Sequence, residues 1–362
     1  MRISSSTTSA VKILSELFKR PAVALAFCVL LSACGGGTHD SSIKLNGPVF
    51  GTRWNLAYLD NPESPVATTT VESAVLEAFT IVNDSMNHYD PESVLSAFNR
   101  MDALELIEVD WDFTYVLESA IDISLRSAGA YDPTVSPAVN LWGFGPDGPS
   151  MVPTATELDA VAAVVGINRL VWDPTTRSLM KRANGVRLDF SSIAKGYAVD
   201  LAADALDGLG IDNFMLEVGG EIQVRGQSPR GGDWRLAIEQ PESAGGRQMI
   251  DAVAITDMGV ATSGDYRNYF IQDGVRYSHL IDPRTVKPIE HDLVSVTVIH
   301  PSTMVADAWA TALMIAGTTE AKTLADINNL GVFMVSRQGD DLVTYANDAM
   351  TSVLMSQQTD NR

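Results

Sequence analysis

The sequence predicts an α+β (mixed α/β) fold in which helices pack on the faces of mixed sheets. Apolar residues recur with helical spacing through much of 70–128, whereas strand-like segments become frequent beyond a loop rich in glycine and proline at 143–153. Helical and strand-like segments then interleave toward the C-terminus. Such interleaving is typical of helices that cover sheet faces.

The first part of the chain is expected to contain one strand and three helices. The strand falls at 49–59, and the helices fall at 70–86, 92–98 and 111–128.

The middle of the chain predicts a short buried strand at 186–190 that leads into an amphipathic helix. The apolar face of the helix begins at Ala194. Ser191 or Ser192 can cap its start, and Gly210 can terminate it.

Lys195 would lie in the first turn of this helix, at the positive end of the helix dipole. An exposed cation there costs roughly 0.3–1 kcal/mol, which a nearby anion would relieve. Asp189 is one candidate for that anion, and a phosphate ligand is another. The alternative is a solvated lysine whose side chain extends away from the helix end.

The last part of the chain predicts several strands followed by two helices. Asp273-Gly274 joins two strand-like segments and is a strong hairpin signal. The expected strands are Phe214–Val218, Trp234–Glu239, Tyr269–Gln272, 275–279 and 293–299, and the expected helices run over 303–316 and from 319.

Residues 1–33 have the features of a secretory signal, with a basic start, a short apolar stretch and small residues before Cys34. Leu-Ser-Ala-Cys followed by glycine resembles a bacterial lipoprotein signal. Cys34 would then carry the lipid anchor, 34–46 would be a flexible tether, 47–355 the folded domain and 356–362 a polar tail. The expected location is the periplasmic side of a bacterial membrane. The alternative is an ordinary secreted protein cleaved nearby.

The formal charge is -20 over 362 residues. This acidic balance argues against nucleic acid as a partner, because a polyanion would be repelled. A phosphate ligand would need local cations or a metal ion.

Two segments carry candidate chemical groups. Asp307 and Thr311 are one turn apart on an expected helix, so both side chains can hold Mg²⁺ through oxygen; the alternative is a helix-stabilising Asp and a Thr bonded to its own backbone. His279, at the end of an expected strand, is the best placed of the five histidines for acid or base work.

Ser192-Ile-Ala-Lys195 also matches the S-x-x-K pattern of penicillin-binding proteins and many β-lactamases. No K-T-G or K-S-G motif follows it, so a serine acyl enzyme would lack its substrate carboxylate site.

Seven motifs, taken together and in order, resemble the ApbE-type FAD:protein FMN transferases. The resemblance runs from Phe50 to Gly317. The motifs are FGT at 50–52, MNHYDPES at 86–93 with FN at 98–99, GAYDPTV at 129–135 with NLWGFG at 140–145, LDFSSIAKGYAVDLAADALDGLG at 188–210, EVGGE at 217–221, ATSGDYRN at 261–268 with YSHLIDP at 277–283, and ADAWAT at 306–311.

The resemblance implies an enzyme that moves FMN from FAD to a threonine or serine of an acceptor flavoprotein, with Mg²⁺ and release of AMP. It also implies an ApbE-like fold. The acceptor would be a membrane redox-pump subunit or another exported flavoprotein. A related FAD pyrophosphatase that releases free FMN, or a non-catalytic FAD-binding lipoprotein, are the alternatives.

The resemblance also assigns residues. By motif, the metal would be held by Asp307, Thr311 and the backbone carbonyl of Ser192, with His279 as a candidate base for the acceptor hydroxyl. The residues that would contact FAD are Phe50, Tyr89, Ala130, Tyr131, Asp132, Asp189, Lys195 and Ile281.

Two positions depart from the family pattern. Ala310 stands where some relatives carry a second aspartate, which leaves fewer anionic metal ligands. Val286 stands where glycine is usual, which can alter the turn beyond His279.

Overall fold

The computed structural model describes residues 42–146, 151–241, 248–266 and 268–356. Its centre is an eight-stranded sheet with the order β1-β2-β6-β7-β10-β15-β16-β17, in which every neighbouring pair is antiparallel. The strands are β1 (Ile43–Val49), β2 (Thr52–Tyr58), β6 (Phe214–Val218), β7 (Glu221–Arg225), β10 (Met258–Gly264), β15 (Leu293–His300), β16 (Gly331–Gln338) and β17 (Asp341–Ala346).

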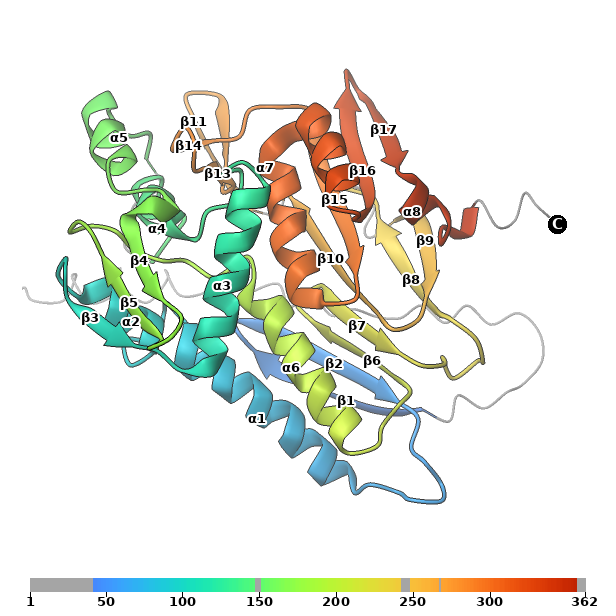
Figure 1. Cartoon of the computed structure of the whole chain (residues 1–362). Coiled ribbons are helices and arrows are strands. Elements are labelled where there is room, and N and C mark those ends of the chain that lie inside the picture. The colour runs from blue at the N-terminus through green and yellow to red at the C-terminus, as the bar shows by residue number, and fades with distance from the viewer. Residues whose placement is uncertain (1–41, 147–150, 242–247, 267, 357–362) are drawn as a thin grey trace, which may run out of the picture.

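Four long helices lie on one side of this sheet, and the second of them packs against the first and the fourth (Figure 1). They are α1 (Thr68–Met86), α3 (Trp111–Arg126), α6 (Ala194–Gly208) and α7 (Thr303–Ile327). The largest apolar core lies between these helices and the sheet. On the opposite face, a second core is covered by β8 (Trp234–Glu239), β9 (Met249–Ile255) and α8 (Asp348–Thr351). The predicted α+β class is therefore confirmed.

Smaller elements surround this frame. A three-stranded sheet has the order β3-β5-β4, and two hairpins are separate from the main sheet. These elements are α2 (Val94–Arg100), β3 (Leu106–Glu108), α4 (Ser136–Leu141), α5 (Ala155–Ala162), β4 (Leu170–Asp173), β5 (Ser178–Lys181), β11 (Tyr269–Gln272), β12 (Val275–Ser278), β13 (Ile281–Asp282) and β14 (Lys287–Pro288), with short 3₁₀ turns at Pro133–Val135 and Ile167–Arg169.

The predicted strand at 49–59 is wrong at its start. The chain reverses at Phe50 and Gly51, whose φ angles are 46° and 71°, and β1 pairs with β2 on either side of this turn. β1 begins at Ile43, so the last residues assigned to the tether belong to the sheet. The signal segment 1–33 and Cys34 lie outside the described residues.

The predicted strand at 186–190 is also wrong, because this buried segment joins no sheet. The side-chain amide of Asn99 takes the place of a neighbouring strand: it donates to the Leu188 carbonyl at 2.9 Å and accepts from the Leu188 N–H at 2.7 Å. The buried Lys181 ammonium donates to the Val186 carbonyl at 3.2 Å. Side chains thus satisfy the backbone groups that a strand partner would otherwise bind.

Helix α6 begins at Ala194 as predicted, but neither serine caps it. Its N-cap residue is Ile193, which has no capping side chain. The Ser191 N–H instead donates to Asp189 Oδ1 at 2.8 Å, in a turn that precedes the helix. Gly210 follows the last helical turn with a φ of 78°, as expected for a terminating glycine.

The other late elements match their predictions. The β11–β12 hairpin turns at Asp273 and Gly274, both with positive φ, which fits the predicted two-residue turn. The two helices predicted from 303 and 319 form α7, which is interrupted at Gly317, where φ is 76° and ψ is 164°.

Candidate functional site

Lys195, Glu221 and Asp307 form a charged cluster between α6, β7 and α7. The Lys195 ammonium lies 2.6 Å from Glu221 Oε1 and 3.8 Å from Asp307 Oδ2. Both carboxylates are buried, whereas Lys195 is partly exposed. Lys195 therefore pairs with Glu221 and Asp307, and the predicted partner Asp189 lies 3.6 Å from His88. These two buried carboxylates of Glu221 and Asp307 share the Lys195 ammonium, and two negative charges in a buried cluster favour the binding of a further cation.

Asp307 belongs to α7, and its side chain also binds the start of α6. Its Oδ2 accepts a hydrogen bond from the Gly196 N–H at 3.1 Å. The first N–H groups of a helix have no partner within the helix, and here a carboxylate from α7 supplies one. Burial raises the pKa of Asp307 to about 7; the charge of Lys195 opposes this rise and that of Glu221 adds to it.

Thr311, one turn beyond Asp307 on α7, lies beside β10. Its hydroxyl is 2.9 Å from that of Ser263. The two oxygens of Asp307 and Thr311 therefore come from one helix, as the spacing predicted. Ala310 between them is fully buried in the core, so no second carboxylate comes from that position.

Tyr131 and Ser192 belong to the same neighbourhood. Burial, followed by the nearby carboxylates of Asp307, Asp189 and Asp132, raises the pKa of the Tyr131 phenol, and the Ser192 side chain opposes the rise. The Asp189 N–H donates to the Pro133 carbonyl at 2.8 Å and the Gly196 N–H donates to Asp307 at 3.1 Å, so the fold brings the three predicted segments around 131, 189–195 and 307 together.

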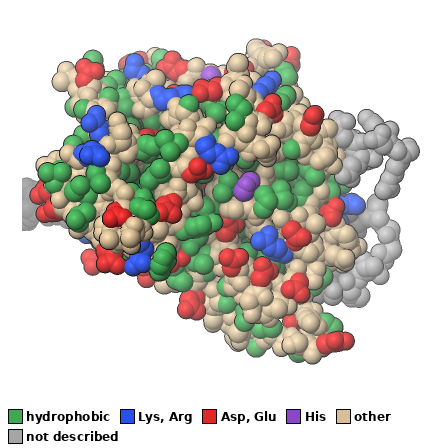
Figure 2. Space-filling model, viewed as in Figure 1, with side chains coloured by type: hydrophobic (Ala, Val, Ile, Leu, Met, Phe, Trp, Pro, Cys, Tyr) green, Lys and Arg blue, Asp and Glu red, His purple; other side chains and the backbone are tan. Residues whose placement is uncertain are grey.

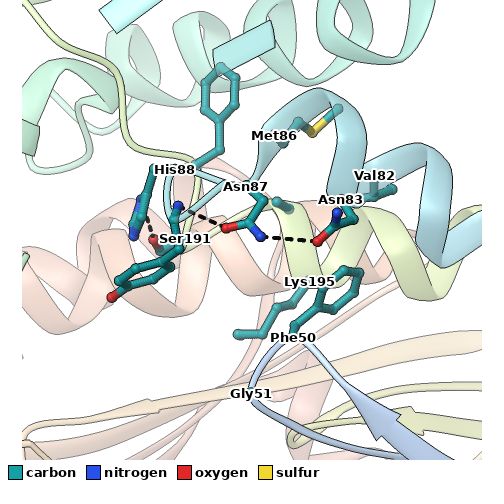
Figure 3. Close-up of a pocket in the computed structure, with 12 residues that line it drawn as sticks. Phe50, Gly51, Val82, Asn83, Met86, Asn87, His88, Ser191 and Lys195 are labelled. Atoms are coloured by element: carbon teal, nitrogen blue, oxygen red, sulfur yellow. Dashed lines mark hydrogen bonds between the residues drawn. The ribbon is translucent and has the colours of Figure 1, made fainter. Parts of the chain in front are cut away.

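A cavity of about 590 Å³ opens beside the cluster. Figure 3 shows Phe50 and Lys195 extending side by side into it, with Gly51 below them and α1 above. Tyr89 also lines the cavity and is largely exposed. The remaining lining residues are Gly51, Val82, Asn83, Met86, Asn87, His88, Phe190, Ser191 and Ala194.

His88 links this wall to Asp189, a contact that sequence reasoning missed. The His88 Nδ1 lies 3.6 Å from Asp189 Oδ1 and 3.5 Å from the Ser191 hydroxyl (Figure 3), and its ring stacks obliquely on Tyr89 at 4.2 Å. Burial alone would raise the pKa of Asp189, but His88 and the donors of Ser191 outweigh it and hold the pKa below its usual value.

Three residues predicted to contact FAD are buried in the structure. Asp132 caps the 3₁₀ turn that follows it and accepts from the Thr134 N–H at 2.8 Å and from the Ile167 N–H at 3.0 Å. Ala130 and Ile281 are also buried. Both carboxylate oxygens of Asp132 thus bind backbone N–H groups of the protein, and Oδ2 keeps acceptor capacity for a further donor.

His279 lies at the end of the β11–β12 hairpin. Its Nδ1 is 2.9 Å from the carbonyl of Asn268, and its ring meets Phe144 edge-on at 6.3 Å. A hydrogen bond to a carbonyl favours the tautomer with the proton on Nδ1, which places the basic lone pair on Nε2.

The turn beyond His279 contains Val286, a position at which the family resemblance led us to expect glycine. Its φ of 52° is in the left-handed region, which a β-branched residue rarely adopts. The side chain is buried, and its carbonyl accepts from the Trp142 indole at 2.9 Å. The turn thus holds a valine in a conformation that favours glycine, and burial of its side chain together with the Trp142 hydrogen bond offsets the backbone strain.

The donor set fits a magnesium ion better than a softer metal. Asp307 and Thr311 offer hard oxygens, and within the described ranges no group of three or more His, Cys, Asp or Glu residues could hold a metal ion by itself. A Mg²⁺ ion that keeps waters and shares a phosphate needs only a few protein ligands.

The surface shows no sign of a polyanion site on the face in view. Lys and Arg side chains are dispersed among acidic and apolar ones in Figure 2 rather than gathered in one patch. In the part of the chain that the structure describes, no helix has the length and apolarity needed to cross a bilayer.

Comparison with known proteins agrees with the motifs. Residues 50–334 match the ApbE family. The chain belongs to the ApbE family. A relative named FAD:protein FMN transferase from Vibrio cholerae is 41% identical over 92% of this chain and 98% of its own, and one from Escherichia coli K12 is 35% identical over 88% and 92%.

Solved ApbE structures share the fold. The flavin transferase ApbE from Vibrio cholerae superposes with a TM-score of 0.80 at 39% identity, covering 86% of this chain and 99% of that one. The apo form of the Pseudomonas stutzeri flavinyl transferase ApbE gives 0.79 at 37% identity, covering 86% and 96%. Family membership replaces the acyl-enzyme interpretation of Ser192 and Lys195.

Proposed function

We propose that this ApbE-family protein transfers the FMN moiety of FAD to a threonine or serine of an acceptor flavoprotein, with Mg²⁺ and release of AMP. The observation that carries the proposal is the meeting of Asp307 with the start of α6 and Lys195, at the wall of a cavity of about 590 Å³. The family membership and the names of the relatives agree with it.

The cavity suits the flavin and the start of α6 suits the pyrophosphate. Phe50 and Tyr89 present aromatic rings at the cavity wall, against which a planar ring system can pack. Lys195 supplies a positive charge at a helix N-terminus, where phosphate groups are favoured. Asp189, held as a carboxylate beside His88, can accept hydrogen bonds from the ligand.

Asp307, Thr311 and the carbonyl of Ser192 would hold Mg²⁺. When bound, the ion supplies Lewis-acid stabilisation of charge on the phosphate oxygens. The protein's own contribution is placement: α7 carries Asp307 and Thr311 on one face, and Ser263 orients the Thr311 hydroxyl.

The transfer replaces the phosphoanhydride bond of FAD with a phosphoester bond to the acceptor. The acceptor hydroxyl oxygen attacks the phosphorus of the FMN half, the bond from that phosphorus to the bridging oxygen breaks, and the bridging oxygen leaves with AMP. The hydroxyl proton must pass to a base, for which His279 is our candidate. Cys34, lipidated on the periplasmic side of the membrane, would tether the enzyme near exported or membrane-bound acceptors.

The test is incubation of the protein with FAD and Mg²⁺, with and without an unmodified acceptor protein whose threonine can receive FMN. Flavin fluorescence on the denatured acceptor and its mass report transfer. Asp307→Asn should abolish the product, whereas Asp326→Asn, an exposed position on the same helix, should not. Free FMN formed equally without an acceptor would instead show a pyrophosphatase, and FAD binding without turnover would show a carrier.

A further inference from the structure

The start of α7 is held by a single carboxylate from α6. Asp200 Oδ1 accepts from the Thr303 N–H at 2.7 Å, and Oδ2 accepts from the Ser302 hydroxyl at 2.6 Å and from the Met304 N–H at 3.0 Å. The Ser302 hydroxyl in turn accepts from the Val305 N–H at 3.2 Å. The first turn of α7 is therefore capped by its own serine and by another helix at once.

The same turn has no room to shift. A methyl group on Gly196 of α6 would lie 2.5 Å from the Thr303 carbonyl oxygen and 2.6 Å from Met304 Cα. A methyl group on Gly259 of β10 would lie 2.7 Å from Thr303 Cα. The Thr303 hydroxyl also donates to Gln223 of β7 at 2.6 Å. Three elements therefore enclose the start of α7.

These contacts set the relative position of Lys195 and Asp307. Helices α6 and α7 run antiparallel, since Gly196 binds Asp307 while Asp200, one turn later on α6, binds residues one turn before Asp307. Asp200 thus fixes the axial register of the two helices. A slide of α7 would move Asp307 away from the Gly196 N–H and from Lys195.

We propose that Asp200 is a positioning residue for the metal and pyrophosphate site, acting through α7 and not by contact with the ligand. This proposal rests on the proposed function. Residues that orient metal ligands typically change metal affinity about 10- to 100-fold when they are replaced. A residue that only caps a helix would change thermal stability and leave metal affinity alone.

The test compares Asp200→Ala with Asp110→Ala. Asp110 is a matched cap at the start of α3, where it accepts from the Phe113 N–H at 2.7 Å and from the Ser85 hydroxyl at 3.1 Å. Calorimetry with FAD present measures the Kd for Mg²⁺, and thermal unfolding measures stability. We expect both variants to lower Tm, and only Asp200→Ala to raise the Kd for Mg²⁺, by about tenfold or more.

Asp200→Asn gives a second readout. It keeps one acceptor oxygen for the Ser302 hydroxyl and Met304 N–H and loses the other, so its Kd for Mg²⁺ should lie between those of wild type and Asp200→Ala. Excess Mg²⁺ should restore the rate of transfer in both Asp200 variants. Equal, wild-type-like Mg²⁺ affinity in Asp200→Ala and Asp110→Ala would overturn the proposal while leaving the proposed function intact. Absence of Mg²⁺ binding in the wild type would overturn both.

Discussion

Asp307 of α7 accepts a hydrogen bond from the Gly196 N–H at the start of α6, across 111 positions of sequence. The residue expected to hold a metal ion therefore also accepts a hydrogen bond from a backbone N–H in the first turn of the helix that carries Lys195. This explains why α6 tolerates a lysine at its positive end: the buried carboxylates of Asp307 and Glu221 lie beside it.

Close packing at Gly196 predicts the effect of a single methyl group. Gly196→Ala should lower the free energy of unfolding by about 1–3 kcal/mol, because the new carbon meets backbone atoms that cannot rotate away. Transfer activity should fall as Asp307 is displaced. Gly208→Ala on the same helix is the matched control: it meets no atom within 4 Å and should stabilise by about 0.5–1 kcal/mol. Urea unfolding of both variants gives the answer, and equal effects would contradict the packing argument.

The Lys195–Glu221 ion pair should show strong energetic coupling. Lys195→Met leaves two buried carboxylates without their cation, which should be strongly destabilising. Glu221→Gln in the same chain removes one of these charges. The double variant should therefore lose less stability than the sum of the losses of the two single variants. A double-mutant cycle should give a coupling of about 0.5–3 kcal/mol. The exposed Arg126–Asp122 pair on α3 provides the comparison and should couple by less than about 0.5 kcal/mol. A similarly small coupling energy for both pairs would contradict the conclusion that Lys195 and Glu221 form a strongly coupled, partly buried ion pair.

His88 should shape the pH dependence of FAD binding. In the wild type, His88 and Ser191 hold the pKa of Asp189 below its usual value despite burial. His88→Ala removes part of that support, so the pKa of Asp189 should rise and the carboxylate should be lost at a higher pH. FAD affinity measured by fluorescence from about pH 4.5 to about pH 7.5 should therefore decline earlier on acidification in the variant. Coincident profiles would show that Asp189 does not bind FAD as a carboxylate.

His300 should make the fold less stable on acidification. Burial lowers its pKa, and its Nδ1 accepts from the Ser302 N–H at 3.0 Å. Because the folded pKa is below the unfolded one, the stabilisation is complete above the unfolded pKa and is lost as the pH falls through the folded pKa. His300→Asn keeps an acceptor that does not titrate. Between about pH 7.5 and about pH 5, the wild type should lose more free energy of unfolding than His300→Asn. Parallel losses in urea titrations would rule out a contribution from His300.

Much of the site was predictable because its motifs are local. The spacing of Asp307 and Thr311 placed both oxygens on one helix face, and the hairpin at Asp273-Gly274 followed from turn chemistry. Glu221 belongs to a motif that we recognised, but its ion pair with Lys195 was not predicted. Only the pairing of β7 in the sheet directs Glu221 toward Lys195.

The two mistaken elements have different physical causes. The segment 186–190 has the apolar pattern of a buried strand, but Asn99 and Lys181 satisfy its backbone from distant parts of the chain. The strand at 49–59 contained a reversal at Phe50 that local propensity did not reveal. Side chains that take the place of a neighbouring strand, as at 186–190, leave no periodic pattern in the sequence.

Sequence alone determined the fold class, the family resemblance and the residue types of the site, because periodicity and short motifs are local properties of the chain. The tertiary structure decided which charges meet: Lys195 with Glu221, Asp189 with His88, and Asp307 with the start of α6. Those pairings depend on the register of α6 against α7 and the sheet, which is fixed by close packing at Gly196 and Gly259 and by the hydrogen bonds of Asp200.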